Sequence, residues 1–337
     1  MKRLPWPLVF QVIGALVAVA FVVATWQVWM LLFTSLIIAS AILPAARVGQ
    51  RFRVPRGFTV LAVYVVAAGV FTLMGRLLWP ALSEQWHQFI DQLPRLIDNV
   101  KGWLGDVQGF FGQWGVSTPA PKADNVQGLA GILLGNAVRV TTGAVGILFE
   151  LLAVLVIAAY LVIDAREIGH TLLALLPPAH RPTATRLAPA VLDRVGGYVR
   201  GQIVSSFFVG VLIAIALSLL GVQYALLIGA LAAVLNIVPF VGATVAAVLA
   251  TLSALNTSVV LAGVALGVMV VCQTVEGKLL APYFVGRATG LHALAVLLAL
   301  LAGFHLAGLI GGLVAVPLLA GVWEIVRTLY VEPQRHS

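Results

Sequence analysis

The sequence contains little charge for its length. Only 9% of its 337 residues are aspartate, glutamate, lysine or arginine, whereas 61% are hydrophobic. Soluble domains carry about 25% charged and about 45–50% apolar residues. The mean hydropathy of +1.06 therefore excludes a water-soluble globular domain. Because the apolar runs are continuous and do not alternate as barrel strands do, we predict an all-α, polytopic transmembrane helical protein.

Cysteine and enzyme motifs are also scarce. The single cysteine, Cys272, excludes an intrachain disulfide and a CxxC metal site. No HExxH, GxSxG or Walker-type GxxxxGK[ST] motif occurs. We therefore expect no enzyme activity, no cofactor and no ATP hydrolysis. The net charge of +8 reflects basic residues on the cytoplasmic side of helices, so the expected partner is the lipid bilayer and not nucleic acid.

Residues 1–80 contain three predicted transmembrane helices. The block Pro7–Ala46 suits two antiparallel helices with a turn near Trp26, and a third helix runs over Phe58–Trp79. The basic start MKRLPWPLVF lacks a small-residue cleavage site, which indicates an uncleaved first helix. Arginines also follow the first block. We therefore predict a protein of the bacterial inner membrane whose amino terminus is on the cytoplasmic side. These arginines are Arg47, Arg51, Arg53 and Arg56.

The middle of the chain alternates between polar and apolar segments. Residues 81–142 have apolar side chains at helical spacing and an acidic excess, which predicts an amphipathic helical insertion outside the cytoplasm. A fourth transmembrane helix at 143–163 returns the chain, and 164–201 is a cytoplasmic Arg-rich loop. A fifth helix starts at Gln202 and opens a transport region that extends over 202–337.

Two apolar segments of the last third are interrupted. Tyr224–Leu255 contains Asn236, Pro239 and Gly242, and Leu291–Val326 contains several glycines and a proline. A re-entrant hairpin at Tyr224–Leu255 would leave Lys278 and Arg287 cytoplasmic, whereas full spans would not, so we favour the hairpin topology. The similar shape of Leu291–Val326 suggests a second hairpin that enters from the opposite side. The total is about eight membrane segments. The interrupting residues of the second segment are Gly303, Gly308, Gly311, Gly312 and Pro317.

The breaks point to transport. A proline within a membrane segment costs free energy, because Pro239 cannot donate a backbone hydrogen bond. Non-helical backbone at membrane depth persists only where protein buries it or where it lines a watery cavity. Transporters hold substrates and ions at such broken helix ends. The alternative is a proline kink whose backbone groups are satisfied by neighbouring helices.

Four motifs resemble the autoinducer-2 exporter (AI-2E) family of permeases. They are VGGYVRGQ (195–202), LNIVPFVGATV (235–245), EGKLLAPYFVGRATGLH (276–292) and GLIGGLVAVPL (308–318). The resemblance covers nearly the whole chain and is strongest over its last 150 residues or so. Ala243, Lys278 and Ala293 depart from the family pattern. The resemblance implies export of small solutes and homo-oligomers, with pentamers as the expected state. The positions matching its motifs are Tyr198, Arg200, Gly201, Gln202, Pro239, Gly242, Glu276, Gly277, Pro282, Gly286, Gly308, Gly311 and Pro317.

Candidate site residues follow from these breaks. Glu276 is the leading candidate for ion coupling, since an ionisable group at the end of an apolar helix often marks an ion path. Its alternative role is an ion pair with Lys278 or Arg287, and that of Asn236 is an interhelical packing contact. Glu150 is a second coupling candidate. The predicted substrate and ion path comprises Asn236, Pro239, Gly242, Gln273, Glu276, Gly308, Gly311 and Pro317.

The predicted function is a membrane permease. It would export a small polar solute such as autoinducer-2 by alternating access, coupled to protons or cations. Two alternatives remain open: a sodium/proton antiporter, and an oligomeric membrane scaffold without transport. The sequence identifies neither the substrate nor the coupling ion.

Overall fold

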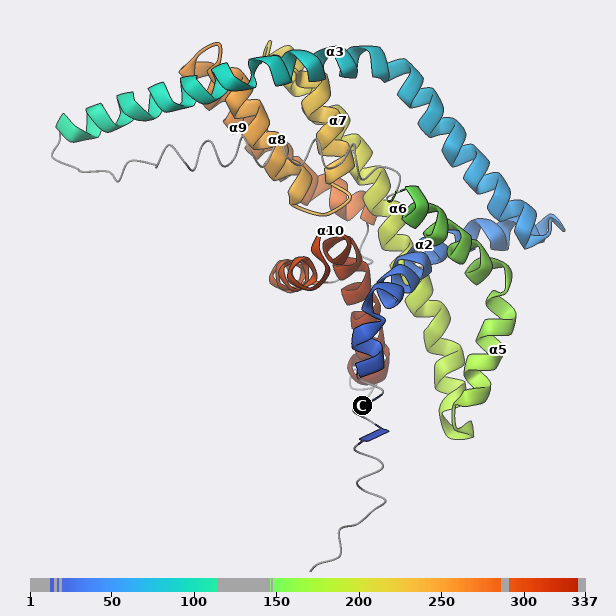
Figure 1. Ribbon diagram of the computed structural model, residues 1–337. Coiled ribbons are helices and arrows are strands. Elements are labelled where there is room, and N and C mark those ends of the chain that lie inside the picture. Colours follow the sequence, from blue (N-terminus) through green and yellow to red (C-terminus); the bar gives the residue numbers. More distant parts are fainter. Residues whose placement is uncertain are drawn as a thin grey trace, which may run out of the picture. The chain divides into compact units, whose positions relative to one another are not determined.

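A computed structural model describes residues 13–14, 17, 20–113, 146, 148–285 and 291–332. Within these ranges every regular element is a helix (Figure 1), which confirms the all-α class. Five helices are long and apolar enough to cross a membrane, or six if the bent pair Leu148–Ile163 and Ala165–Leu175 is one span. The chain is therefore a polytopic helical membrane protein. The total of about eight segments stays a prediction, because much of the first apolar block lies outside the described residues.

The contacts divide the chain into two compact units. Unit 1 comprises Met1–Val60, Leu148–Gly196 and Leu291–Ser337, and unit 2 comprises Leu61–Ile147 and Gly197–Gly290.

The elements in chain order are α2 (Trp26–Arg51), α3 (Arg56–Gln113), the helix Leu148–Ile163, α5 (Ala165–Leu175), η1 (Pro178–His180), α6 (Arg181–Leu219), α7 (Ala225–Leu235), α8 (Val241–Leu255), α9 (Val259–Val275), η2 (Glu276–Val285), α10 (Ala293–Val326) and η4 (Arg327–Val331).

The third predicted helix does not end at Trp79. Instead α3 continues through Pro80 and Pro94 to Gln113, so the transmembrane and amphipathic parts form one bent helical element (Figure 1). A proline removes one backbone hydrogen bond and bends a helix whose neighbouring residues still favour helix. In the turn after Pro80, the Ser83 hydroxyl donates to the Pro80 carbonyl at 3.0 Å. The part of the predicted insertion at 114–142 lies outside the described residues.

The segment predicted as an Arg-rich loop is helical. It contains α5, the 3-10 turn η1 and the first half of α6, which begins at Arg181 and not at Gln202. Pro182 stands in the first turn of α6, where a missing N–H has no intrahelical partner to lose. The segment was predicted to be a loop because of its polar composition. Its arginines and alanines are, however, compatible with a helix.

Unit 2 has a core of small and aliphatic side chains between α6, α7, α8 and α9. Gly210 and Gly229 bring α6 and α7 close together, since a Cβ added to Gly210 would lie 2.6 Å from the Gly229 carbonyl oxygen. α3 contacts this bundle at α7, where the Gln85 side chain accepts a hydrogen bond from the Leu227 N–H at 2.9 Å. The fully buried large side chains of this core include Ile213, Leu217, Ile228 and Met269.

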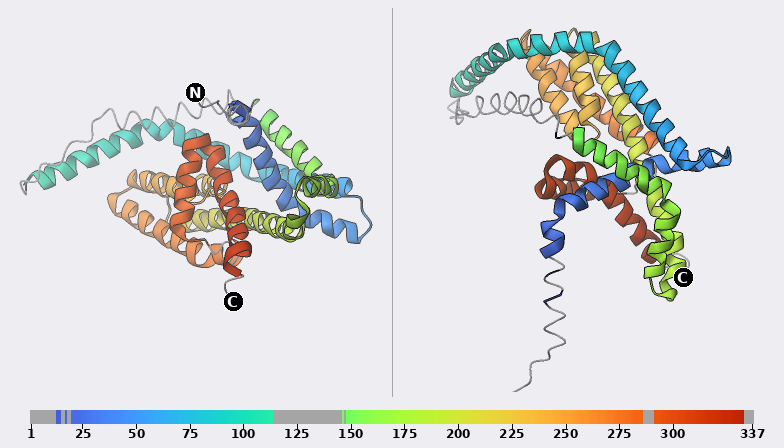
Figure 2. Two further views of the ribbon diagram at one scale, coloured as in Figure 1. Left: turned by 90° about the horizontal axis from the view of Figure 1, so that it is seen from below. Right: turned by 45° about the vertical axis from the view of Figure 1, so that its right-hand side comes forward.

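In unit 1, α10 is broken as the sequence predicts. Ala307 and Gly308 have non-helical backbone angles, and Gly308 has φ +58°. The two arms fold back on each other (Figure 2, left), because Gly303 lies against the backbone of Gly311. Only glycine allows so close an approach of two helix backbones at this bend. The predicted interruption of Leu291–Val326 is thus confirmed.

Candidate functional site

The break between α7 and α8 is a five-residue turn, 236–240. α7 ends at Leu235 and α8 begins at Val241, and both helices are too short to cross the bilayer alone. Phe240 has φ +68°, a left-handed conformation that reverses the chain before α8. Local turns satisfy the backbone on both sides of Pro239, with Val238 N–H bound to the Leu235 carbonyl and Val241 N–H to the Val238 carbonyl. The predicted interruption of Tyr224–Leu255 is confirmed.

Gly242 allows the first turn of α8 to contact the end of α7. A Cβ at this position would lie 2.6 Å from the Ala232 carbonyl oxygen and would overlap the Asn236 backbone nitrogen. Gly242 therefore fixes where Asn236 stands.

Two helices and the turn itself contribute polar groups at this break. Gln202 of α6 donates from Nε2 to the main-chain carbonyl of Asn236 at 2.6 Å. Asn236 in turn donates from Nδ2 to Glu276 Oε1 at 2.6 Å. The chain of contacts joins α6, the α7–α8 turn and the start of η2, all within unit 2. We call Gln202, Asn236 and Glu276 the polar triad.

Two members of the polar triad are withdrawn from solvent, and Glu276 is half-buried. Asn236 has 0% of its surface exposed and Gln202 has 7%. The Asn236 Oδ1 atom is buried and has no hydrogen-bond partner among the described residues. A buried polar atom without a partner inside a membrane protein calls for a ligand, a water or a proton donor. The triad therefore has the means to bind one further donor or cation.

Glu276 begins a π-helix. The family motif from Glu-Gly to Pro-x-x-Gly forms η2 over Glu276–Val285, while Gly286 lies outside the described residues. α6 contacts η2 closely: Gly201 lies against the backbone of Phe284, and the Phe208 and Phe284 rings stack with centroids 4.9 Å apart. The wide π-helical turn is common at functional sites. It keeps Glu276 beside α7 while Pro282 is accommodated within a helix.

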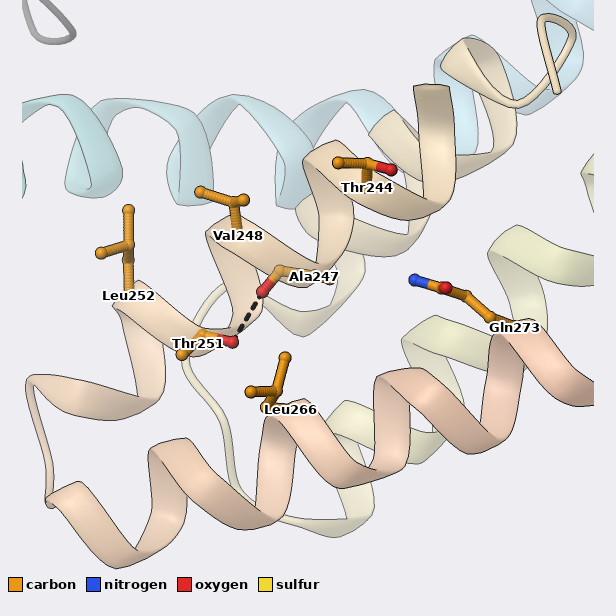
Figure 3. Close-up of a pocket in the computed structure, with 7 residues that line it drawn as sticks. All are labelled: Thr244, Ala247, Val248, Thr251, Leu252, Leu266 and Gln273. Atoms are coloured by element: carbon orange, nitrogen blue, oxygen red, sulfur yellow. Dashed lines mark hydrogen bonds between the residues drawn. The ribbon is translucent and has the colours of Figure 1, made fainter. Parts of the chain in front are cut away.

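A groove of about 370 Å³ lies between α8 and α9 (Figure 3). The Gln273 amide extends from α9 toward α8, one helical turn before Glu276. No charged side chain is among the residues that line it, all of which are described. They are Thr244, Ala247, Val248, Thr251, Leu252, Leu266 and Gln273.

The structure brings together only part of the predicted path. Asn236, Pro239, Gly242 and Glu276 meet at the turn, and Gln273 lines the groove on the same helix as Glu276. Gly308, Gly311 and Pro317 belong to α10 in unit 1. Glu150 also lies in unit 1, where it is exposed near the start of the helix Leu148–Ile163. Glu276 and Lys278 are both described, and no ion pair joins them; Arg287 lies outside the described residues.

Sequence reasoning missed the role of Gln202. It matched a family motif but was not a site candidate, although a glutamine inside an apolar helix is a detectable signal. In unit 1, Glu324 forms a buried ion pair with Arg194.

The apolar spans, and the polar triad at a break between two short apolar helices, are features of a helical, multi-pass membrane protein of the permease type. The family model for AI-2E family transporters matches residues 8–330. The chain belongs to this family, and it is a membrane transporter.

Relatives match over most of their length. YrrI of Bacillus subtilis (strain 168), named as a candidate transport protein, is 28% identical over 295 residues, covering 86% of this chain and 83% of YrrI. YueF of the same strain is 24% identical over 288 residues, covering 83% and 78%. YhhT of Escherichia coli (strain K12) is 25% identical over 268 residues, covering 78% and 73%. Both also bear names of candidate transport proteins.

Proposed function

We propose that this chain exports a small polar solute such as autoinducer-2 across the bacterial inner membrane, by alternating access coupled to protons or cations. The observation that carries the proposal is the Asn236–Glu276 hydrogen bond at the break between two half-length helices. An ionisable group within an apolar span is costly to keep and marks ion or proton paths. Family membership supports transport of a solute.

The polar triad supplies a way to couple an ion to a helix movement. Asn236 donates to the Glu276 carboxylate and holds the α7–α8 turn against the α9–η2 junction. Protonation of Glu276, or binding of a cation to it, weakens the hydrogen bond that it accepts from the Asn236 amide. The turn is then free to move relative to η2, which opens the path on one side.

Transport by reconstituted protein tests this proposal. Autoinducer-2 efflux from proteoliposomes would be measured over a range of internal and external pH for the wild type and Glu276→Gln. We expect the variant to lose the pH dependence of efflux. The matched control is Glu84→Gln, an exposed carboxylate of α3 that accepts a hydrogen bond from Gln88. Unchanged pH dependence in Glu276→Gln would remove Glu276 from coupling, and wild-type vesicles without flux would favour a scaffold.

A sodium/proton antiporter is the second candidate function. The unpartnered Asn236 Oδ1 favours it, because amide and carboxylate oxygens are ligands that hard cations accept. A single carboxylate balances one positive charge, so the coupled cation would be monovalent. Sodium-driven proton flux in vesicles without added solute, abolished by Glu276→Gln, is the expected result for this function. Absence of that flux in vesicles that export autoinducer-2 would exclude it.

The remaining expectations are part of the same proposal. The amino terminus lies in the cytoplasm, and the chain assembles as a homo-oligomer, with a pentamer as the expected state. Mass measurement of the purified protein in detergent would count the subunits.

A further inference from the structure

The helix α5 is amphipathic, and the described residues of unit 1 leave it uncovered. Ile168, Leu172 and Leu175 are spaced four and three residues apart and therefore share one face, while Arg166 and His170 share the opposite face. All eleven residues of α5 are described, and none is buried. Leu172 and Leu175 are 59% and 77% exposed. An apolar stripe so exposed needs an apolar neighbour.

The orientation of α5 follows from the helix before it. The helix Leu148–Ile163 leads into α5 with only Asp164 between them, and the two axes differ by 75°. If the first helix stands upright in the bilayer, α5 lies within about 15° of the membrane plane. Its eleven residues span about 16 Å, of which only about 4 Å is depth.

Arg56 marks the end of the preceding span. Its guanidinium donates from Nη1 to the carbonyls of Val162 and Ile163, at 3.5 and 3.3 Å. Both carbonyls belong to the last turn of that helix, and a guanidinium at a span end sits at headgroup level. α5 therefore starts at the membrane surface.

A single bent span that continues into α5 is disfavoured by charge. It would carry Arg166 and Glu167 into the hydrocarbon, where charged side chains are costly to insert. An in-plane helix keeps both residues out of the acyl chains. Arg181 holds the other end of α5, because its side chain donates to the carbonyls of Leu176 and Ala174 at 3.0 and 3.2 Å.

We propose that α5 is an interfacial helix that lies on the bilayer surface, with Leu172 and Leu175 in the boundary between headgroups and acyl chains. The partner of this surface is lipid. The geometry matches that of in-plane amphipathic helices, whose apolar face is buried about 5–10 Å into the boundary. The inference concerns membrane anchoring of unit 1 and does not depend on the transported solute.

Spin labels on the two faces of α5 test the proposal in the full chain. Leu175→Cys and His170→Cys would each be made with Cys272→Ser, labelled, and reconstituted in vesicles of phosphatidylcholine and phosphatidylglycerol. Collision with oxygen, which concentrates in lipid, and with a water-soluble nickel chelate would be measured by power saturation. We expect the Leu175 label to collide with oxygen and the His170 label to collide with the chelate, with a several-fold difference in the ratio between the two sites.

Two results would overturn the proposal. A Leu175 label that meets the chelate as often as the His170 label places α5 in water. A Leu175 label shielded from both reagents places a protein partner over the stripe. Leu172→Cys repeats the measurement one turn away, and because both leucines are mostly exposed, each substitution removes little packing. Thermal unfolding of each labelled protein in detergent checks that it remains folded.

Discussion

Asn236 and Glu276 are joined by a 2.6 Å hydrogen bond although 40 residues separate them in the chain. The bond links the turn between two half-length helices to the first residue of a π-helix. Its donor is fully buried, so the bond is shielded from competing water. Hydrogen bonds to charged groups contribute about 1.5–3 kcal/mol, more than those between neutral groups.

A double-mutant cycle on this pair should reveal the coupling. Asn236→Ala is expected to lower the free energy of unfolding by about 1.5–3 kcal/mol, because it removes the donor to a half-buried carboxylate. With Glu276→Gln already present, the same change should cost less. Asn99 and Asn256 form an exposed hydrogen bond at 2.9 Å and serve as the control cycle, with a smaller coupling. Additive effects at Asn236 and Glu276 would show that the charge of the carboxylate adds nothing to the bond. Thermal unfolding in detergent measures both cycles.

Gly242→Ala should destabilise the protein by about 1–3 kcal/mol through overpacking. The added methyl group would displace Asn236, so transport should fall together with the melting temperature. Gly263→Ala is the matched control, because nothing lies within 4 Å of a Cβ at that helical position. It should be neutral or stabilising, since alanine favours helix over glycine by about 1 kcal/mol. Equal melting temperatures for the two variants would contradict the close approach at Gly242.

Gly308→Ala should destabilise α10 for a different reason. Space is available at this position, but φ +58° with ψ −140° is a conformation that side chains other than glycine rarely adopt. We expect a cost of about 1–3 kcal/mol from backbone strain alone. Gly69→Ala, another position with open space but within a regular helix, should show no such loss. A Gly308→Ala variant as stable as Gly69→Ala would mean that the bend is not held at this residue.

Two ion pairs of unit 1 should differ in how much they contribute to the free energy of unfolding, because they differ in burial. The Arg194 and Glu324 side chains are 9% and 12% exposed, whereas those of Arg47 and Asp193 are 45% and 49% exposed. Glu324→Leu should cost about 3–5 kcal/mol and be largely recovered when Arg194→Met is added. Arg47→Ala should change stability by about 0.2–1 kcal/mol. Chemical denaturation of the four proteins checks the order, and a loss at Arg47 as large as at Glu324 would contradict it.

The breaks were predictable because they depend on local chemistry. Pro239 lacks an N–H and Gly308 permits a positive φ, and both effects act wherever those residues stand. Local rules failed where context decides. Pro80 was read as a helix end, but a long apolar helix tolerates one missing hydrogen bond. The contact between Gln202 and the Asn236 carbonyl depends on how α6 and α7 pack, which no local pattern encodes. The same holds for Arg194 and Glu324, which lie 130 residues apart.

The length of α7 has an electrical consequence. Eleven residues reach about 16 Å, roughly half of the hydrocarbon thickness, so a helix that starts at one surface ends near the midplane. If α7 starts at one surface, Asn236 stands about halfway through the voltage drop, with Glu276 hydrogen-bonded to it. An elementary charge crossing the full drop is worth about 2.3 kcal/mol per 100 mV, so a proton that reaches Glu276 from one side gains or loses about half of that. The resting membrane potential alone would thus bias which side of the membrane loads this carboxylate.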